Sequence, residues 1–186
     1  MLMSMMENDV WKLGIVEAIE PMGEGSRVCI DAADVLSPAE GLLVGDTGHG
    51  YIYILSENRT TSTYPARVFR INAGAVHQYI FEEGETRYLA EVENDEPVTI
   101  YEGQASRQVP VGRVKIEKRD LVRVTVRAGE VSLSATLQWA DSVYLMTDQY
   151  EPMALKDCQL GDRIYCRIDE PGRHLGQSIQ EEIEEK

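Results

Sequence analysis

The sequence has few basic residues, few cysteines and no long apolar run. Among its 186 residues, Lys and Arg total 18 and Asp and Glu total 32, which gives a formal net charge of −14 and a pI near 4.6. The shortage of positive charge argues against nucleic acid and against anionic membrane surfaces as partners. No segment approaches the ~20 consecutive apolar residues of a membrane-spanning helix. We therefore expect no nucleic-acid partner and no membrane.

The three cysteines, Cys29, Cys158 and Cys166, cannot all pair with one another, and none lies in a Cys-x-x-Cys motif. Unpaired thiols of this kind are typical of a reducing compartment, where they fill apolar cores. Residues 1–12 lack a basic segment followed by a sustained apolar stretch, so they do not look like a secretory signal. We expect a cytoplasmic protein.

Helix signals are also scarce, because the one internal candidate, 31–40, is limited to about one turn by Pro38. Short apolar or alternating segments recur instead between turns that contain Gly, Asp and Asn. The predicted strands are 11–18, 27–30, 41–44, 51–55, 76–81, 87–92, 98–101, 109–116, 121–127, 132–138, 142–146 and 163–168. This pattern predicts a mainly β, barrel-like domain of many short, mostly antiparallel strands with little helix.

Two turns are predicted to close hairpins, the glycine-rich 45–50 and the acidic 82–85. We take 1–15 as a leader with the first strand and 16–186 as one β-rich domain, with two β-subdomains meeting near 82–95 as an alternative. Segments 89–98 and 155–164, 66 residues apart, share an apolar pair, an acidic turn and a strand start. They are either a duplicated unit or a turn that recurs in barrels.

The densest group of unusual residues lies between Gly45 and Tyr79. Strand alternation puts Arg70 and Asn72 on one face, where a guanidinium fork and an amide donor would hold an anion or carboxylate. The small residues of 72–75 would let a backbone approach a ligand closely. The alternative is a tight turn with two solvated arginines.

Several other sites are weaker. Gly45–Gly50 has no Gly-Lys-Ser/Thr ending and lies between strands, which argues against a phosphate loop, and no nucleophile or Rossmann motif is present. His49 and His77 are metal-ligand candidates with Asp46 or Glu57, although lone histidines are more often simply hydrogen-bonded. Lys115 lies on a predicted strand in which charged and apolar residues alternate. The alternative is that the charged face of this strand is simply solvated and has no binding role. His174 lies in a loop that either caps a site or is a surface turn.

In order along the chain, several segments resemble the archaeal-type, NAD-dependent 3-dehydroquinate synthase II family. The most specific run from Arg67 through Phe69-Arg70-Ile71-Asn72-Ala73-Gly74-Ala75 to His77 and Tyr79, followed by Gly112-Arg113-Val114-Lys115-Ile116-Glu117. The other segments are 27–31, 36–45, 86–89 and 172–176. The resemblance extends from about Val16 to Lys186.

The resemblance implies oxidative deamination of 2-amino-3,7-dideoxy-D-threo-hept-6-ulosonate with NAD and cyclisation to 3-dehydroquinate, in the shikimate route to aromatic amino acids. A sister branch makes 3-amino-4-hydroxybenzoate. Both chemistries need a grip for the substrate's amino-acid head and a proton-transfer group beside a carbonyl. At the matching positions we assign His77 and Glu57 as acid/base residues. Substrate or cofactor binding is assigned to Arg67, Arg70, Asn72, Lys115 and His174. No metal ligand is assigned, and a divalent metal is left open.

The sequence departs from the family in one large respect. Family members have a long N-terminal region, which we expect to be mixed α/β and to carry an amine-reactive lysine, and this sequence does not contain it. The turn after Leu42-Leu43-Val44 usually carries serines, whereas here it is glycine-rich. We therefore expect a separately encoded N-terminal half or a homo-oligomer, and an inactive isolated chain. Three functions stay open: half of a 3-dehydroquinate synthase, a sister-branch cyclase, or a non-catalytic β-barrel that binds a small acidic metabolite or a partner.

Overall fold

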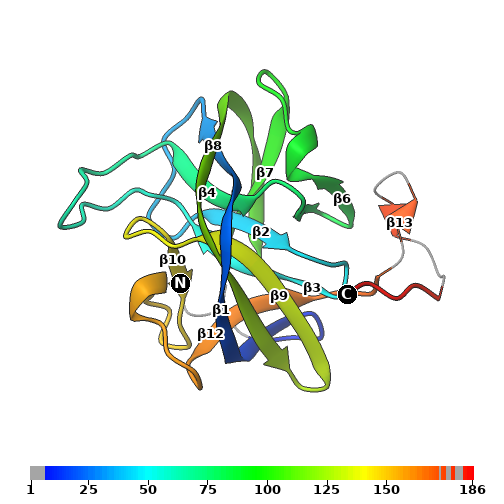
Figure 1. Ribbon diagram of the computed structural model, residues 1–186. Helices are drawn as coiled ribbons and strands as arrows, with labels where there is room; N and C mark the ends of the chain where they lie inside the picture. The colour runs from blue at the N-terminus through cyan, green and yellow to red at the C-terminus, as the bar shows by residue number, and fades with distance from the viewer. Residues whose placement is uncertain (1–6, 172, 175–176, 179–181) are drawn as a thin grey trace.

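The computed structural model describes residues 7–171 and 182–186 with side chains, and 173–174 and 177–178 as backbone (Figure 1). Its described residues form fourteen strands, two 3-10 turns and no α-helix, and all named strand pairs are antiparallel. This confirms the mainly β, antiparallel prediction. The strands are β1 (Trp11–Ala32), β2 (Gly41–Gly45), β3 (Gly50–Leu55), β4 (Arg70–Ala75), β5 (Tyr79–Glu82), β6 (Glu85–Tyr88), β7 (Pro97–Glu102), β8 (Ala105–Ala128), β9 (Val131–Gln138), β10 (Tyr144–Met146), β11 (Pro152–Ala154), β12 (Arg163–Ile168), β13 (Arg173–His174) and β14 (Gln177–Ser178).

Two long strands, β1 and β8, form the centre of the fold and pair antiparallel along most of their length (Figure 1). Each contains two of the short strands predicted from the sequence, and the predicted breaks at 19–26 and 117–120 are wrong. The chain stays extended there because register shifts at 16/18 and 21/23 absorb the extra residues as bulges. Gly23 has φ +84°, a value that glycine adopts without a steric penalty.

The strands on the two sides of the β1–β8 pair are arranged in a similar way. On the β1 side the order is β12, β3, β10 and β11, and on the β8 side it is β7, β2, β5 and β6. The two arms also meet, because β2 pairs with β3. β4 pairs with β1, and β9 pairs with β8. The strand pairings on the two sides of β1 and β8 therefore follow a similar pattern.

The two echoing segments occupy equivalent positions in this arrangement. A 3-10 turn at Leu89–Glu91 precedes β7, and another at Leu155–Asp157 precedes β12, each with its leucine buried. β7 pairs with the first part of β8, and β12 pairs with the first part of β1. The geometry favours a duplicated unit over an unrelated recurring turn.

Both predicted hairpins form. β2 and β3 pair from Gly41↔Leu55 to Val44↔Ile52, and β5 and β6 pair as far as Glu82↔Glu85. The second turn is tighter than predicted, because Glu82 and Glu85 belong to the strands. The helical turn predicted within 31–40 does not form. Residues 33–40 are irregular, and Leu36 is tied to the segment before β4 by a backbone hydrogen bond of 2.7 Å to Val68.

The core has two parts. The larger is aliphatic and includes the inward-facing residues of β1, β8 and β9, among them Val28, Val124 and Leu137. The smaller is aromatic, and Trp11 packs edge-on against Tyr53 and Tyr101 at ring distances of 5.9 and 6.0 Å. Within the described residues, no helical segment has the length and hydropathy to span a membrane.

Candidate functional site

Five of the seven residues predicted for the site gather on one face of the fold. Strand β1 lies between β4 and β8 over residues 27–31, so that Cys29 is opposite Asn72 on one side and Lys115 on the other. Paired residues of antiparallel strands point to the same face. We call this surface the arginine face; it comprises Arg27, Cys29, Asp31, Glu57, Arg67, Arg70, Asn72, Arg113, Lys115, Glu117 and Gln138.

A buried carboxylate, Asp31, anchors two arginines of this face. Arg70 contacts it through Nε and Nη2 at 2.7 and 3.1 Å, and Arg113 Nε donates to Oδ2 at 2.7 Å. Burial alone would raise the pKa of Asp31, but the two guanidinium groups outweigh burial and lower it. Asp31 is therefore a carboxylate that orients Arg113, whose side chain is 58% exposed.

A second polar side chain, that of Gln138, links three strands. Gln138 Oε1 on β9 accepts hydrogen bonds from Arg27 Nη1 at 2.6 Å and from Asn72 Nδ2 at 2.8 Å. Arg27 Nη2 also pairs with Glu117 at 2.8 Å. Arg27 Nε and Asn72 Oδ1 are buried and have no hydrogen-bond partner. A donor and an acceptor of this kind are costly to bury unpaired.

Glu57 and Cys29 are buried members of the arginine face. Glu57 pairs with Arg67 at 2.8 Å, and its backbone N–H donates to the Arg70 carbonyl at 2.7 Å. Burial raises the pKa of Glu57, although Arg67, Arg70 and Arg27 act in the opposite direction. Burial also raises the pKa of the Cys29 thiol to about 11, so the thiol stays protonated at neutral pH.

The arginine face is positive in a strongly acidic chain. It holds five basic and three acidic side chains, a formal charge of 5 − 3 = +2. Arg119, which pairs with Glu117, brings a further positive charge to this face. Arg113 and Lys115 are the most accessible of its cations, with 58% and 40% of their side chains exposed. Guanidinium and ammonium groups with free donors bind carboxylates and phosphates.

His77 lies in the turn between β4 and β5, and its ring bonds to a second buried carboxylate, that of Asp46. Asp46 accepts hydrogen bonds from His77 Nε2 at 2.8 Å and from the hydroxyls of Ser134 and Thr136 at 2.7 Å each. Arg123 Nε lies 3.3 Å from its other oxygen. Burial would raise the pKa of Asp46, but the hydrogen bonds from His77, Ser134 and Thr136 prevail and lower it. Asp46 thus fixes an imidazole whose side chain is half exposed.

Strand β9 joins the two groups. Alternate residues of a strand share a face at a spacing of about 7 Å, so Thr136 beneath Asp46 and Gln138 beneath Arg27 are adjacent positions on it. The two groups are therefore connected through the polar face of β9, by Gln138 on one side and Thr136 on the other.

Other predicted residues lie elsewhere. The ring of His49 bonds to Thr47 through Nδ1 at 2.8 Å, and Glu57, suggested as a co-ligand, pairs with Arg67. Among residues with described side chains, no group of three or more His, Cys, Asp or Glu is arranged to hold a metal. His174 belongs to β13 and pairs with Gln177, and its side chain lies outside the described residues.

The described residues contain no Rossmann-type dinucleotide-binding motif. Such a cofactor binds its pyrophosphate at a glycine-rich turn that opens a helix, and no α-helix occurs in the described part of the chain. The glycine-rich Gly45–Gly50 segment closes the β2–β3 hairpin instead. The small-residue stretch also differs from expectation, because a Cβ on Gly74 would lie 2.3 Å from the Thr136 carbonyl oxygen. Gly74 permits close packing against β9 rather than the approach of a ligand.

The sequence analysis assigned no site role to Arg27, Asp31, Arg113 or Gln138, and it considered Asp46 only as a possible metal ligand. The alternation of Arg27, Cys29 and Asp31 within one short strand is a signal for a shared polar face, and it was available in the sequence. Gln138 carried no such signal, because its role depends on the pairing of β9 with β8.

Comparison with known proteins gives a consistent result. The family model described as the 3-dehydroquinate synthase II C-terminal domain matches residues 14–186. A protein from Methanosarcina barkeri named 3-dehydroquinate synthase is 39% identical over 184 residues, 97% of this chain and 48% of that protein. One of the same name from Methanothermobacter thermautotrophicus is 37% identical over 100% of this chain and 50% of its own length. The chain spans about half the length of these relatives. No solved structure matches.

Proposed function

The chain belongs to the 3-dehydroquinate synthase II family as its C-terminal domain, and from this we propose that it forms the substrate-holding half of an enzyme that makes 3-dehydroquinate. Its match to the family model covers residues 14–186, and its relatives are about twice as long. The observation that carries the proposal is the arginine face, a positively charged site in a chain of net charge −14. The substrate in this proposal is an amino-keto sugar acid, whose carboxylate needs such a site.

Within this proposal, Arg113 and Lys115 hold the substrate carboxylate. Both have exposed side chains, and Asp31 fixes the guanidinium of Arg113 at 2.7 Å. Arg70, which was expected to grip the carboxylate directly, has its fork occupied by Asp31. Arg70 therefore acts as a positioning residue, because it fixes and partly neutralises the carboxylate that orients Arg113.

Two groups serve proton transfer. Glu57 is buried with a raised pKa, which brings its carboxyl closer to the range useful for a general acid or base near neutral pH. His77 is accessible, and Asp46 holds its Nε2, leaving Nδ1 as the nitrogen that faces a substrate. Proton transfer next to the substrate carbonyl would use one of these two groups, and we favour His77 because it is reachable from solvent.

The remaining parts of the activity lie outside the described residues. NAD would accept a hydride in the oxidative deamination, and we assign no residue of this chain to it. An N-terminal half, encoded with this chain or apart from it, would bind NAD and supply the amine-reactive lysine. Operation in the cytoplasm, in the shikimate route to aromatic amino acids, belongs to the same proposal. A divalent metal stays an open prediction.

The test is an activity assay on the chain co-expressed with the N-terminal half of the Methanosarcina barkeri synthase, with 2-amino-3,7-dideoxy-D-threo-hept-6-ulosonate and NAD as substrates. We expect NADH and 3-dehydroquinate to form, and Arg113→Ala to raise KM more than it lowers kcat. Arg127→Ala is the matched control, because Arg127 pairs with Glu17 away from the arginine face. An assembled but inert pair that still binds the substrate would favour the non-catalytic binding function. A pair that turns over only the sister-branch substrate would favour that cyclase.

A further inference from the structure

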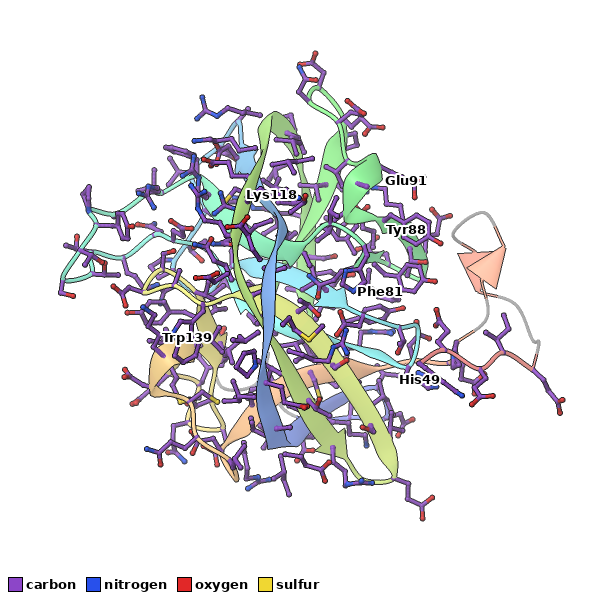
Figure 2. The ribbon with its side chains drawn as sticks, viewed as in Figure 1. His49, Phe81, Tyr88, Glu91, Lys118 and Trp139 are labelled. Atoms are coloured by element: carbon purple, nitrogen blue, oxygen red, sulfur yellow. The ribbon has the colours of Figure 1, made fainter. Side chains whose placement is uncertain are left out.

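An apolar groove opens where the long strands β1 and β8 cross beside the end of β9. We call it the Trp139 groove; it is lined by Ile19, Pro21, Gly23, Asp120, Leu121, Val122 and Trp139 and has a volume of about 350 Å³. Trp139 is 41% exposed, and Met22, the residue between Pro21 and Gly23, is 45% exposed. Figure 2 shows Trp139 on the flank of the fold opposite His49. Leu121 and Val122 are only 7% exposed each, so Trp139 is the exposed large apolar side chain of the groove. An exposed tryptophan beside an apolar groove is typical of a protein-binding surface.

The groove lies beside a register shift in β1. Pro21 pairs with Val122 and Gly23 with Leu121, on either side of a register shift in β1. Gly23 has no side chain, so Leu121 has no apolar partner across the ladder at this point. Trp139 follows the last residue of β9, and its backbone N–H bonds to the Asp120 carbonyl at 3.0 Å, which fixes the backbone at this point. Lys156 Nζ lies 5.8 Å from the centroid of the indole ring.

We propose that the Trp139 groove is the docking surface for the N-terminal half of the synthase, an inference that rests on the proposed function. Two observations identify this occupant. The curated relatives contain about as much chain again as the part matched here, and the matching family model is that of a C-terminal domain. A chain that folds as one half of such a protein needs a surface on which the other half packs.

The groove also adjoins the candidate site. Leu121 pairs with Gln138, the residue that joins Arg27 and Asn72, and Trp139 is the next residue in the chain. A domain seated on Trp139 would therefore lie beside Gln138, at the end of the arginine face away from Arg113. A second copy of this chain fits less well, because each copy has a net charge of −14 and the two would repel.

The test measures association alone, without substrate or NAD. The tagged chain is co-expressed with the untagged N-terminal half of the Methanosarcina barkeri synthase, and the dissociation constant of the purified pair is compared between variants. We expect Trp139→Asp to weaken association at least about tenfold, in line with the loss of an interface tryptophan. Leu160→Asp is the matched control, because Leu160 is 66% exposed outside the groove, and it should leave association unchanged.

Amide hydrogen exchange is a second test of the docking surface, and it needs no variant. In the wild-type pair, we expect slower exchange at 19–23 and 119–122 than in the chain alone. No association between the halves, association that Trp139→Asp leaves intact, or self-association of the chain that Trp139→Asp abolishes would each overturn the proposal. A pair that dissociates with Trp139→Asp but makes no NADH would refute the proposed activity and leave the docking surface standing.

Discussion

Arg70 and Asp31 form a two-point ion pair under the arginine face, with Nε 2.7 Å from Oδ1 and Nη2 3.1 Å from Oδ2. Both side chains are largely buried. Arg70 therefore stabilises the Asp31 carboxylate, a negative charge that would be costly to bury without a counter-charge. Arg113 reaches the same carboxylate from the solvent side. The buried Arg70 therefore holds the Asp31 carboxylate in place, and the exposed Arg113 is the arginine that can bind the substrate carboxylate.

The two arginines should differ in their effect on stability. Arg70→Ala removes the main partner of a buried charge and is expected to lower the free energy of unfolding by about 3 kcal/mol. Arg113→Ala removes a largely exposed partner and should cost about 1 kcal/mol or less. Urea unfolding of both variants measures the difference. Equal losses would contradict the division of roles.

Asp46 should make stability depend on pH in the acid range. Its pKa in the folded chain lies below the ordinary value of 3.8. A carboxyl whose pKa is lowered by folding contributes stability that is present above the unfolded pKa and is lost as pH falls through the folded pKa. Wild type should therefore exceed Asp46→Asn in stability by about 1–3 kcal/mol at neutral pH. This margin should shrink below about pH 4.

Unfolding in urea across that pH range measures the margin. Asp9→Asn, a change at an exposed position, controls for the general loss of one negative charge. A margin that stays constant down to about pH 2 would mean that the Asp46 carboxylate is not stabilised by its four neighbours.

Gly74 and Gly84 offer a matched pair of glycines. Their φ angles are +87° and +91°, so alanine is strained equally at both, by about 1–2 kcal/mol. Only at Gly74 would the new Cβ also collide with β9, 2.3 Å from the Thr136 carbonyl oxygen. Gly74→Ala should therefore cost about 1–3 kcal/mol more than Gly84→Ala in thermal or urea unfolding. Similar losses would show that β4 and β9 can move apart.

The sequence allowed the fold class and both hairpins to be predicted, because alternation and glycine-rich turns are local signals. It did not reveal the length of β1 and β8, since bulges let a strand continue through residues that normally end one. For the site, alternation grouped only Arg70 and Asn72, while Glu57, Arg67 and Lys115 were named as candidates without being placed together. The engagement of Arg70 with Asp31 could not be foreseen, because it depends on which strands pair.

The most direct measurement is the heat of binding of 3-dehydroquinate to the chain assembled with the Methanosarcina barkeri N-terminal half. The comparison is between wild type, the double variant Arg113→Ala/Lys115→Ala and the control Arg127→Ala. If the arginine face holds the carboxylate, the double variant should bind at least about tenfold more weakly, because each charge-assisted contact contributes roughly 1.5–3 kcal/mol. The control should match wild type. Equal dissociation constants for wild type and the double variant would contradict the assignment of this face as the substrate site.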